Sequence, residues 1–460
     1  MDKLRPTSTN LDLIPAWFLR LVAPVFAAPI SQLFNQSIIQ AVVPVQWKKA
    51  FICPIPKVTH PESPVDFRPI SITPVLSRIM EKLVVRNYIY PALLTPPQTL
   101  TFQDQFAFRP TGSTTAALIA FYHHICEMLS TNSYVRVIAL DFSKAFDTVR
   151  HATLFEKLAR LDIPDEVYNW IRDFFQARSQ STKFSGDESD FAELLASIFQ
   201  GSGVGPACYV ITAGDLQTLN VKNKLLKYAD DTYLIIPAET TLTVADEIRH
   251  IEDWSKENNL NLNRAKSREI IFTRTRARCH QVIYPPVIVD IPRVEKLTVL
   301  GVVVNAKLTV SDHVTEVIHS CSRNLYALKM LQTHGLTGQS LHHVFTAAIQ
   351  SKLLYCSPAW SGFTTAADRR RLDVFIRRSK RYGYCSPDAL PVSELFDNAD
   401  NALFRAIINN SSHILGHFLS IKSRNNYNAR HRKHNFELIK KTTSLGDRNF
   451  LIRMLYKDIY

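Results

Sequence analysis

Two stretches of the chain show the clearest pattern of apolar and polar positions. Residues 135–142 form an apolar, β-branched run that ends in an acid, which predicts a buried strand with Asp141 at its C-terminal end. Residues 225–237 hold two apolar runs on either side of Asp230 and Asp231. This arrangement predicts a β-hairpin with a pair of acids at its tip.

Helical periodicity follows the hairpin and dominates the last third of the chain. Apolar residues spaced by three or four positions over 244–254 predict one face of an amphipathic helix, which we expect to pack against the sheet. A second helical pattern covers 314–328, with Ser311 as the predicted N-cap and Gly335 as the predicted end. The C-terminal part is therefore expected to be a separate helical lobe.

Composition indicates a large folded protein with a polyanionic partner. The chain has 460 residues, 46% of them hydrophobic, which is enough for one large multi-lobed enzyme or two to three ordinary domains. Lys and Arg outnumber Asp and Glu by 54 to 41, for a formal net charge of +13, and nucleic acid is the leading candidate partner. The seven cysteines show neither a CxxC pair nor zinc-site spacing, so we interpret them as reduced core thiols.

No segment indicates secretion or a membrane. The most apolar early stretch, 17–30, is interrupted by Arg20 and two prolines and is too short to span a bilayer. The Pro-dense segments 54–74 and 285–292 are short enough to be turns, and no repeat is present. We expect an intracellular protein, with nucleus and cytoplasm left open.

The three acids suggest chemistry if the strand and the hairpin are neighbours in one sheet. Asp141, Asp230 and Asp231 would then lie close together, and such carboxylates repel one another unless a cation joins them. Two Mg²⁺ ions would neutralise them, one activating an attacking hydroxyl and the other holding phosphates and the leaving oxygen. Paired acids at a hairpin tip are also common in solvated turns, so this pattern alone leaves both interpretations open.

Seven short motifs in a fixed order favour the chemical interpretation. They are Trp47-Lys48 with Pro54-Ile55-Pro56-Lys57, Asp66-Phe67-Arg68-Pro69-Ile70-Ser71, Ala139-Leu140-Asp141-Phe142-Ser143-Lys144-Ala145-Phe146-Asp147, Gln200-Gly201-Ser202-Gly203-Val204-Gly205-Pro206, Tyr228-Ala229-Asp230-Asp231, Asn261-Leu262-Asn263 with Lys266-Ser267, and Leu300-Gly301-Val302. In this order they resemble the reverse transcriptases of non-LTR, LINE-type retrotransposons, and specifically the jockey-like elements of animals. The fifth motif is the YADD box of that family.

The resemblance implies an α+β, right-hand polymerase fold and assigns the metal-binding set. The expected organisation is an N-terminal helical lead-in (1–37), fingers and an antiparallel-sheet palm (38–305), and a helical thumb with the C-terminal region (306–460). The implied cofactor is Mg²⁺, as two ions, with Mn²⁺ as the alternative. The metal-binding residues would be Asp141, Phe142, Asp230 and Asp231, and Lys266 would act with the three aspartates in catalysis by protonating the departing pyrophosphate.

Further residues take nucleotide-binding roles from the resemblance. Lys57 and Arg68 match positions that grip the triphosphate, although each alone would be interpreted as a surface charge. Gln200 would contact the nucleotide, and Gly201 would let the backbone approach it closely. Phe146, five residues after Asp141, would exclude a ribose 2′-hydroxyl, which favours deoxynucleotide substrates over ribonucleotides. The alternative is that this ring is only part of the core.

The implied partners are an RNA template, a DNA primer and dNTPs. Tyr228, Arg109 and Gly301 match primer and template positions, although Ala107 stands where the family often has glycine. The basic residues within 369–381 accompany apolar ones on a predicted amphipathic helix, which could follow a duplex backbone or be a solvated face.

Two rivals remain open at this stage. Full-length LINE-type proteins carry an endonuclease ahead of the polymerase, and the residues before Trp47 are too few to hold one, so we expect a truncated copy. Such a copy could be a non-catalytic remnant that still binds nucleic acid. The second rival, an RNA-copying RNA polymerase, is disfavoured by Phe146 and by the YADD box.

Overall fold

The protein divides into two compact units, and neither is continuous in sequence. The computed structural model describes residues 11–12, 14–143, 145–194, 197–199, 201–273, 283–421, 434–441 and 443–457. The first unit comprises Met1–Arg109, Phe142–Gln217 and Ile248–Leu262. The second comprises Pro110–Asp141, Thr218–Glu247 and Asn263–Tyr460.

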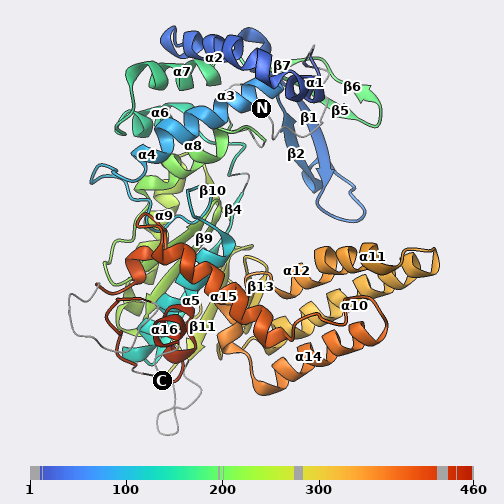
Figure 1. Cartoon of the computed structure of the whole chain (residues 1–460). Coiled ribbons are helices and arrows are strands. Elements are labelled where there is room, and N and C mark those ends of the chain that lie inside the picture. Colours follow the sequence, from blue (N-terminus) through green and yellow to red (C-terminus); the bar gives the residue numbers. More distant parts are fainter. Residues whose placement is uncertain are drawn as a thin grey trace. The chain divides into compact units, whose positions relative to one another are not determined.

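Helices and a small mixed sheet build the first unit. The sheet has the order β2-β1-β5-β6, with β7 also paired to β5, and β1 runs antiparallel to β2 but parallel to β5. The helix α2 packs against α7, and α6 packs against α8 (Figure 1). The elements of this unit are α1 (Ala16–Leu21), α2 (Ala23–Ile39), β1 (Lys49–Pro56), β2 (Phe67–Ile72), α3 (Val75–Val84), α4 (Tyr90–Ala92), β4 (Phe142–Ser143), α6 (His151–Leu158), α7 (Asp165–Phe175), β5 (Ser179–Phe184), β6 (Asp187–Glu188), β7 (Ala192–Glu193), α8 (Gly205–Thr212) and β10 (Asn261–Leu262).

The prediction of turns over 54–74 was wrong in part, because β1 and β2 occupy much of this segment. Pro54 of β1 lies opposite Pro69 of β2. A proline removes one ladder donor, which is tolerated at a sheet edge. Here β2 is an edge strand, and β1 pairs with β5 only over Lys49 to Ile52, before its first proline.

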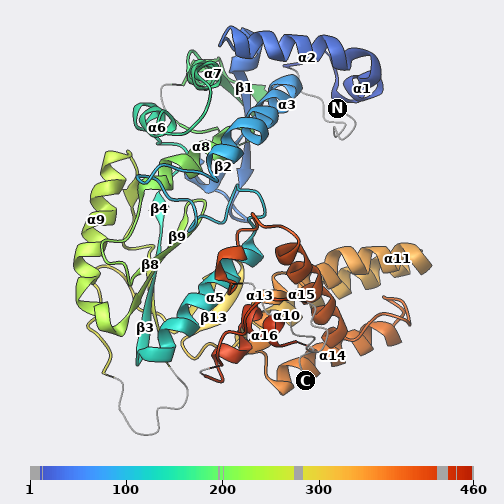
Figure 2. The ribbon, with the colours of Figure 1, turned by 60° about the vertical axis from the view of Figure 1, so that its left-hand side comes forward.

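The second unit is built on an antiparallel sheet with the order β11-β3-β9-β8. Its central strand β3 is apolar at nearly every position and buried on both faces. Ser113 is the N-cap of the helix α5, and its hydroxyl accepts from the Ala116 amide. The helix packs against β3, β8 and β9 (Figure 2). The strands and this helix are α5 (Thr114–Thr131), β3 (Tyr134–Leu140), β8 (Lys224–Tyr228), β9 (Asp231–Pro237), β11 (Arg268–Thr273), β12 (Lys296–Val299) and β13 (Val302–Asn305).

Helices follow β13 to the end of the described chain, as the periodicity predicted. They are α10 (Ser311–Thr333), α11 (Gly338–Phe345), α12 (Ser351–Leu353), α13 (Ser357–Trp360), α14 (Ala366–Arg381), α15 (Val392–Ile408) and α16 (Phe450–Tyr456). The predicted α+β class, with an antiparallel sheet and a helical C-terminal region, is confirmed.

The two ends of α10 test the predicted capping residues. Gly335 has a φ of +95° just beyond the helix, as a C-terminal glycine stop requires. Ser311 is not the N-cap, because Val310 holds that position and Ser311 is the first helical residue. The Ser311 hydroxyl instead donates to Asp368 at 2.7 Å, so a contact distant in sequence has captured it.

Three other expectations can be compared with the structure. The helix α9 (Val244–Glu257) buries the predicted apolar face, including Ile248 and Ile251. The described cysteines are free, but Cys53 is exposed on β1, so the prediction of a core thiol was wrong there; Cys279 lies outside the described residues. In the part of the chain that the structure describes, no helix is both long and apolar enough to cross a bilayer.

Candidate functional site

The sheet of the second unit brings Asp141 next to Asp231. Leu140, the last paired residue of β3, lies opposite Thr232 of β9. One step further in the same antiparallel register places Asp141 opposite Asp231. Tyr228 pairs with Asp231 across a two-residue loop, so Asp230 sits in the turn itself. The C-terminal end of β3 and the tip of the β8–β9 hairpin therefore meet at the same end of this sheet, as predicted.

The charges of these acids influence one another. Burial raises the pKa of Asp231, and the negative charges of Asp230 and Asp141 add to the effect, which brings this pKa to about 6. Asp231 nevertheless keeps contact with solvent at the hairpin tip. A carboxylate whose ionisation is opposed by two others is a favourable ligand for a divalent cation, because the cation removes the repulsion.

The carboxylates do not form a closed ligand cage. Among the residues that the structure describes, no group of three or more His, Cys, Asp or Glu side chains is arranged to hold a metal ion. The oxygen donors of Asp141 and Asp231 are of the type that Mg²⁺ prefers, and their repulsion fits a cation between them. The chemistry of these donors therefore suits a divalent cation, but the described residues are not arranged as an assembled metal site.

A turn over residues 263–267 fixes the backbone of Asp141. The Asp141 amide donates to the hydroxyl of Ser267 at 3.1 Å, and its carbonyl accepts from the Asn263 amide at 2.8 Å. The Ser267 hydroxyl donates in turn to the Asn263 carbonyl at 2.8 Å, and Ser267 is fully buried. Lys266, the expected proton donor, belongs to this turn through its amide and has an exposed side chain. Sequence reasoning assigned no role to Ser267.

Gly301, the predicted primer and template position, lies in the turn that closes the β12–β13 hairpin. Val299 pairs with Val302, and both loop residues have positive φ, +46° for Leu300 and +83° for Gly301, as in a type I′ turn. The Tyr355 hydroxyl donates to the Leu300 carbonyl at 3.0 Å, and its ring carbon lies 3.2 Å from where a Gly301 Cβ would stand. A side chain at this position would meet that ring.

Tyrosines connect this turn with the acidic hairpin. Tyr233 of β9 is buried. Burial and the charge of Asp231 raise the pKa of its phenol, and a hydrogen bond between that phenol and the Leu300 backbone opposes the effect. Tyr228, the predicted primer and template residue, is half-buried, and burial raises its pKa, with the neighbouring Cys356 and Asp231 adding to the effect.

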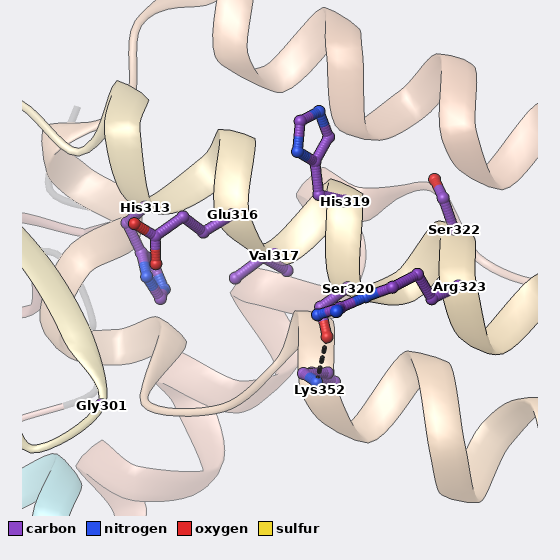
Figure 3. A pocket seen from close by; sticks show the side chains of 9 residues that line it. All are labelled: Gly301, His313, Glu316, Val317, His319, Ser320, Ser322, Arg323 and Lys352. Atoms are coloured by element: carbon purple, nitrogen blue, oxygen red, sulfur yellow. Dashed lines mark hydrogen bonds between the residues drawn. The ribbon is translucent and has the colours of Figure 1, made fainter. Parts of the chain in front are cut away.

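An open groove of about 700 Å³ runs from Gly301 along α10 (Figure 3). Arg323 and Lys352 line it, and the ammonium of Lys352 donates to the Ser320 hydroxyl. His313 closes one end; its Nδ1 accepts from the Val303 amide at 3.4 Å, and burial lowers its pKa to about 4. The acid Glu316 lines the groove as well, so the lining carries charges of both signs.

The first unit carries the predicted triphosphate-binding residues on its β1–β2 hairpin. Arg68 lies opposite Ile55 in the register, and Lys57 follows Ile55 by two residues. Because side chains alternate along a strand, Lys57 and Arg68 share one face. Both side chains are exposed, and the Lys57 ammonium donates to the Val65 carbonyl at 2.9 Å.

Phe146 lies in an aromatic cluster of the first unit. Its ring stacks on Tyr209 at 4.6 Å between centroids and meets Phe108 edge to face at 6.4 Å. The Phe146 carbonyl accepts from the Ile198 amide at 2.7 Å, so its backbone is held as well. The ring is half-buried, which leaves one part of it accessible for contact with a ligand.

The glycine-rich motif packs closely against β2. Gly201 has a φ of +126°, and a Cβ there would lie 2.2 Å from the Ser71 carbonyl oxygen. The close neighbour in the structure is the backbone of β2, and the approach of Gly201 to a nucleotide stays a prediction. Gln200 lies outside the described residues.

Arg109 and the basic residues of α14 are the remaining positions that the sequence suggested for contact with nucleic acid. The Arg109 guanidinium donates to the carbonyls of Phe102 and Gln105 within its own unit, and burial lowers its pKa. In the second unit, α14 buries Leu372, Phe375 and Ile376, as its amphipathic pattern predicted. Its exposed basic residues are Arg369, Arg370, Arg371, Arg377, Arg378 and Arg381.

Comparison with known proteins identifies the family. The family described as reverse transcriptase (RNA-dependent DNA polymerase) matches residues 55–304, more than half of the chain. The chain belongs to the reverse transcriptase family. The resemblance to this family that the seven motifs indicated is thereby confirmed, and all seven lie wholly or partly within the matched residues.

Relatives within this family come from non-LTR retrotransposons of insects. The chain is similar to the probable RNA-directed DNA polymerase from transposon X-element of Drosophila melanogaster, 27% identical over 63% of this chain and 32% of that protein. It is 26% identical to the RNA-directed DNA polymerase from mobile element jockey of the same species, over 66% of this chain and 34% of that protein. This reverse transcriptase chain spans about a third of the length of these curated relatives.

Solved structures of telomerase from Candida tropicalis are more distant. The telomerase complex with a fragment of telomeric RNA is 12% identical and covers 85% of this chain and 67% of that one, with a TM-score of 0.42. The truncated apo telomerase is 15% identical over 62% of this chain and 59% of that one, with a TM-score of 0.39.

Proposed function

We propose that this reverse transcriptase chain is an RNA-directed DNA polymerase that extends a primer with dNTPs by two-metal nucleotidyl transfer. The observation that carries the proposal is that Asp141 and Asp231 lie opposite each other where β3 ends and β9 begins. The charges of Asp141 and Asp230 contribute there to the raised pKa of Asp231. Family membership and the similarity to RNA-directed DNA polymerases of transposons support the same activity.

The acids and the turn beside them would handle the reacting phosphate. Asp141, Asp230 and Asp231, with Phe142 next to the first of them, would hold Mg²⁺. When bound, Mg²⁺ would lower the pKa of the primer 3′-hydroxyl and neutralise the triphosphate oxygens. Lys266 would donate a proton to the departing pyrophosphate, and its exposed ammonium is free to move toward an anion.

The first unit would bind the incoming nucleotide. Lys57 and Arg68 present two positive charges on one hairpin face, a point charge and a planar fork that suit phosphate oxygens. Gln200 and Gly201 would contact the nucleotide in the same proposal. Phe146 offers a ring edge with no hydrogen-bonding atom, which would make a ribose 2′-hydroxyl costly to desolvate.

The primer and template would contact the second unit and Arg109. Tyr228 and the Gly301 turn would meet the primer end, with Arg323 and Lys352 lining the groove beside that turn. The exposed arginines of α14 would contact backbone phosphates, a contact that weakens with added salt. Organisation into a lead-in (1–37), fingers and palm (38–305) and thumb (306–460) belongs to this proposal.

Substrate choice gives the first test. Purified protein is incubated with poly(rA), oligo(dT), Mg²⁺ and either dTTP or UTP, and Phe146→Ala is compared with wild type. We expect wild type to extend with dTTP, and the variant to lose discrimination against UTP by about tenfold or more. Efficient use of UTP by wild type would favour the RNA polymerase instead.

A second candidate is a non-catalytic remnant that binds nucleic acid. The exposed arginines of α14 are the observation in its favour. Salt-sensitive binding of a primer–template, without extension under any divalent metal, would support this candidate over the polymerase.

A further inference from the structure

A buried acid on α3 holds the glycine-rich loop of the first unit. Glu81 is fully buried, and its Oε2 accepts from the backbone amides of Gly203 at 2.6 Å and Val204 at 3.3 Å. Its Oε1 accepts from the Ser77 hydroxyl, one helical turn earlier, at 2.8 Å. Three donors thus occupy most of the acceptor positions of one carboxylate, and two of them belong to the loop.

The loop packs so closely on its support that only small residues fit. A Cβ at Gly203 would lie 3.0 Å from the Cβ of Glu81, and a Cβ at Gly201 would lie 2.2 Å from the Ser71 carbonyl oxygen. Further along the loop, where α8 begins, the Gly205 amide donates to the Ser202 hydroxyl at 2.7 Å. The loop is therefore held by α3, by β2 and by its own serine.

A carboxylate in this place requires compensation. Burial raises the pKa of Glu81, while the Ser77 hydroxyl, the charge of Arg178 and the two loop amides oppose that effect. Arg178 is also fully buried, with its guanidinium 4.3 Å from the ring centroids of Phe174 and Phe199. An apolar residue at Glu81 would avoid the desolvation cost but would leave the loop amides without an acceptor.

We propose that Glu81 is a positioning residue of the nucleotide pocket, which fixes the backbone of the 201–205 segment in the conformation that contacts the incoming nucleotide. The inference rests on the proposed function, because nucleotide contact by this loop is part of it. Glu81 acts through the loop and does not touch substrate. Its effect should therefore appear in the KM for dTTP rather than in kcat.

Two substitutions separate the hydrogen bonds from the bulk of the side chain. Glu81→Gln keeps an oxygen that can accept from Gly203 and Val204, and its amide can donate to Ser77. Glu81→Ala removes the acceptor altogether. We expect Glu81→Ala to raise the KM for dTTP by about tenfold or more with kcat changed by less than about threefold, and Glu81→Gln to restore KM.

Glu247 supplies a matched control. It is likewise fully buried and accepts from the backbone amides of Leu219 at 3.0 Å and Asn220 at 2.9 Å, in the second unit. Glu247→Ala should lower stability in a similar way and leave the KM for dTTP unchanged. Hydrogen exchange of the peptide that contains residues 201–205 provides a readout independent of catalysis.

The outcomes separate this inference from the proposed function. A raised KM and faster exchange in Glu81→Ala, both restored by Glu81→Gln and absent in Glu247→Ala, support the inference. An unchanged KM in Glu81→Ala, or an equal rise in Glu247→Ala, overturns it. If wild type does not extend a primer, the proposed function fails, and exchange decides the remaining claim: faster exchange in Glu81→Ala supports the anchoring of the loop, and equal exchange overturns it.

Discussion

The backbone amide of Asp141 donates to the hydroxyl of Ser267 at 3.1 Å, although 126 residues separate them in the chain. The same hydroxyl donates to the Asn263 carbonyl, and the Asn263 amide donates to the Asp141 carbonyl. One buried serine thus connects the end of β3 to the turn that carries Lys266. This relationship makes the position of Asp141 depend on a residue that cannot itself bind a metal.

Removing the Ser267 hydroxyl should affect both stability and extension. Ser267→Ala leaves the half-buried Asp141 amide without its acceptor, which we expect to cost about 1–3 kcal/mol in the free energy of unfolding. Extension should fall by about 10- to 100-fold per folded molecule, because a displaced acid binds metal less well. Urea denaturation and primer extension measure the two effects.

The control for this variant is Ser255→Ala. Ser255 is also buried, and its hydroxyl donates only to the Glu252 carbonyl within α9 at 2.8 Å. We expect a small stability change and full activity. Wild-type extension rates in folded Ser267→Ala would contradict the positioning of Asp141 by Ser267.

The ionisation of Asp231 should make stability depend on pH. Its pKa is about 6 in the folded protein, above the ordinary 3.8, so between these values the folded state keeps a proton that the unfolded state has lost. In metal-free buffer, wild type should therefore lose stability relative to Asp231→Asn as pH rises from about 4 to about 6. Mg²⁺ at pH 7 should stabilise wild type more than the variant.

Thermal denaturation of both proteins over this pH range gives the measurement. Taking the difference between wild type and Asp231→Asn cancels the other titrating groups. A difference in unfolding temperature that stays constant with pH would show that neither burial nor the neighbouring acids raise the pKa of Asp231.

A buried ion triad should stabilise the sheet edge at β11. Glu269 is fully buried and bonds Arg136 and Arg293, each at 2.7 Å. Glu269→Gln leaves two guanidinium groups without their counter-charge, which we expect to cost about 3–5 kcal/mol. Urea denaturation measures the loss.

An exposed pair provides the comparison for this triad. Lys222 and Glu239 form an ion pair at 2.7 Å with both side chains about half exposed. Glu239→Gln should cost less than about 1 kcal/mol. Equal losses for the two variants would show that burial does not govern the energetics of the triad.

Two glycines separate backbone strain from steric clash. Gly201 and Gly186 both have positive φ, +126° and +97°, so alanine at either position costs about 1–2 kcal/mol. Only at Gly201 would the Cβ meet another atom, the Ser71 carbonyl oxygen. Gly201→Ala should therefore be less stable than Gly186→Ala by about 1–3 kcal/mol, measured by urea denaturation. Equal losses would contradict the close packing of the loop on β2.

Local patterns predicted the elements that carry the acids. The run before Asp141 and the two runs around Asp230 are strands because each is apolar and short, and their pairing follows from burying both faces. The helix α9 and the Gly335 stop were likewise visible, since periodicity and φ preference act over a few residues.

Contacts between residues distant in sequence determined the features that local patterns did not predict. The strands at Pro54 and Pro69 exist because each lies at a free edge, which depends on the order of strands in the sheet. The Ser311 hydroxyl donates to Asp368 of α14 and does not cap α10. Glu81 gave only a weak signal, a charged residue on the apolar face of α3, and its partner Gly203 is 122 residues away.

Primer extension is the most direct test of template-directed nucleotidyl transfer by Asp141, Asp230 and Asp231. Wild type and Asp230→Asn are compared on poly(rA) and oligo(dT) with dTTP and Mg²⁺, after circular dichroism has shown that both are folded. We expect extension by wild type and a loss of about 100-fold or more in the variant. Equal extension by the two proteins, or none by either, would overturn the proposed roles of the three acids.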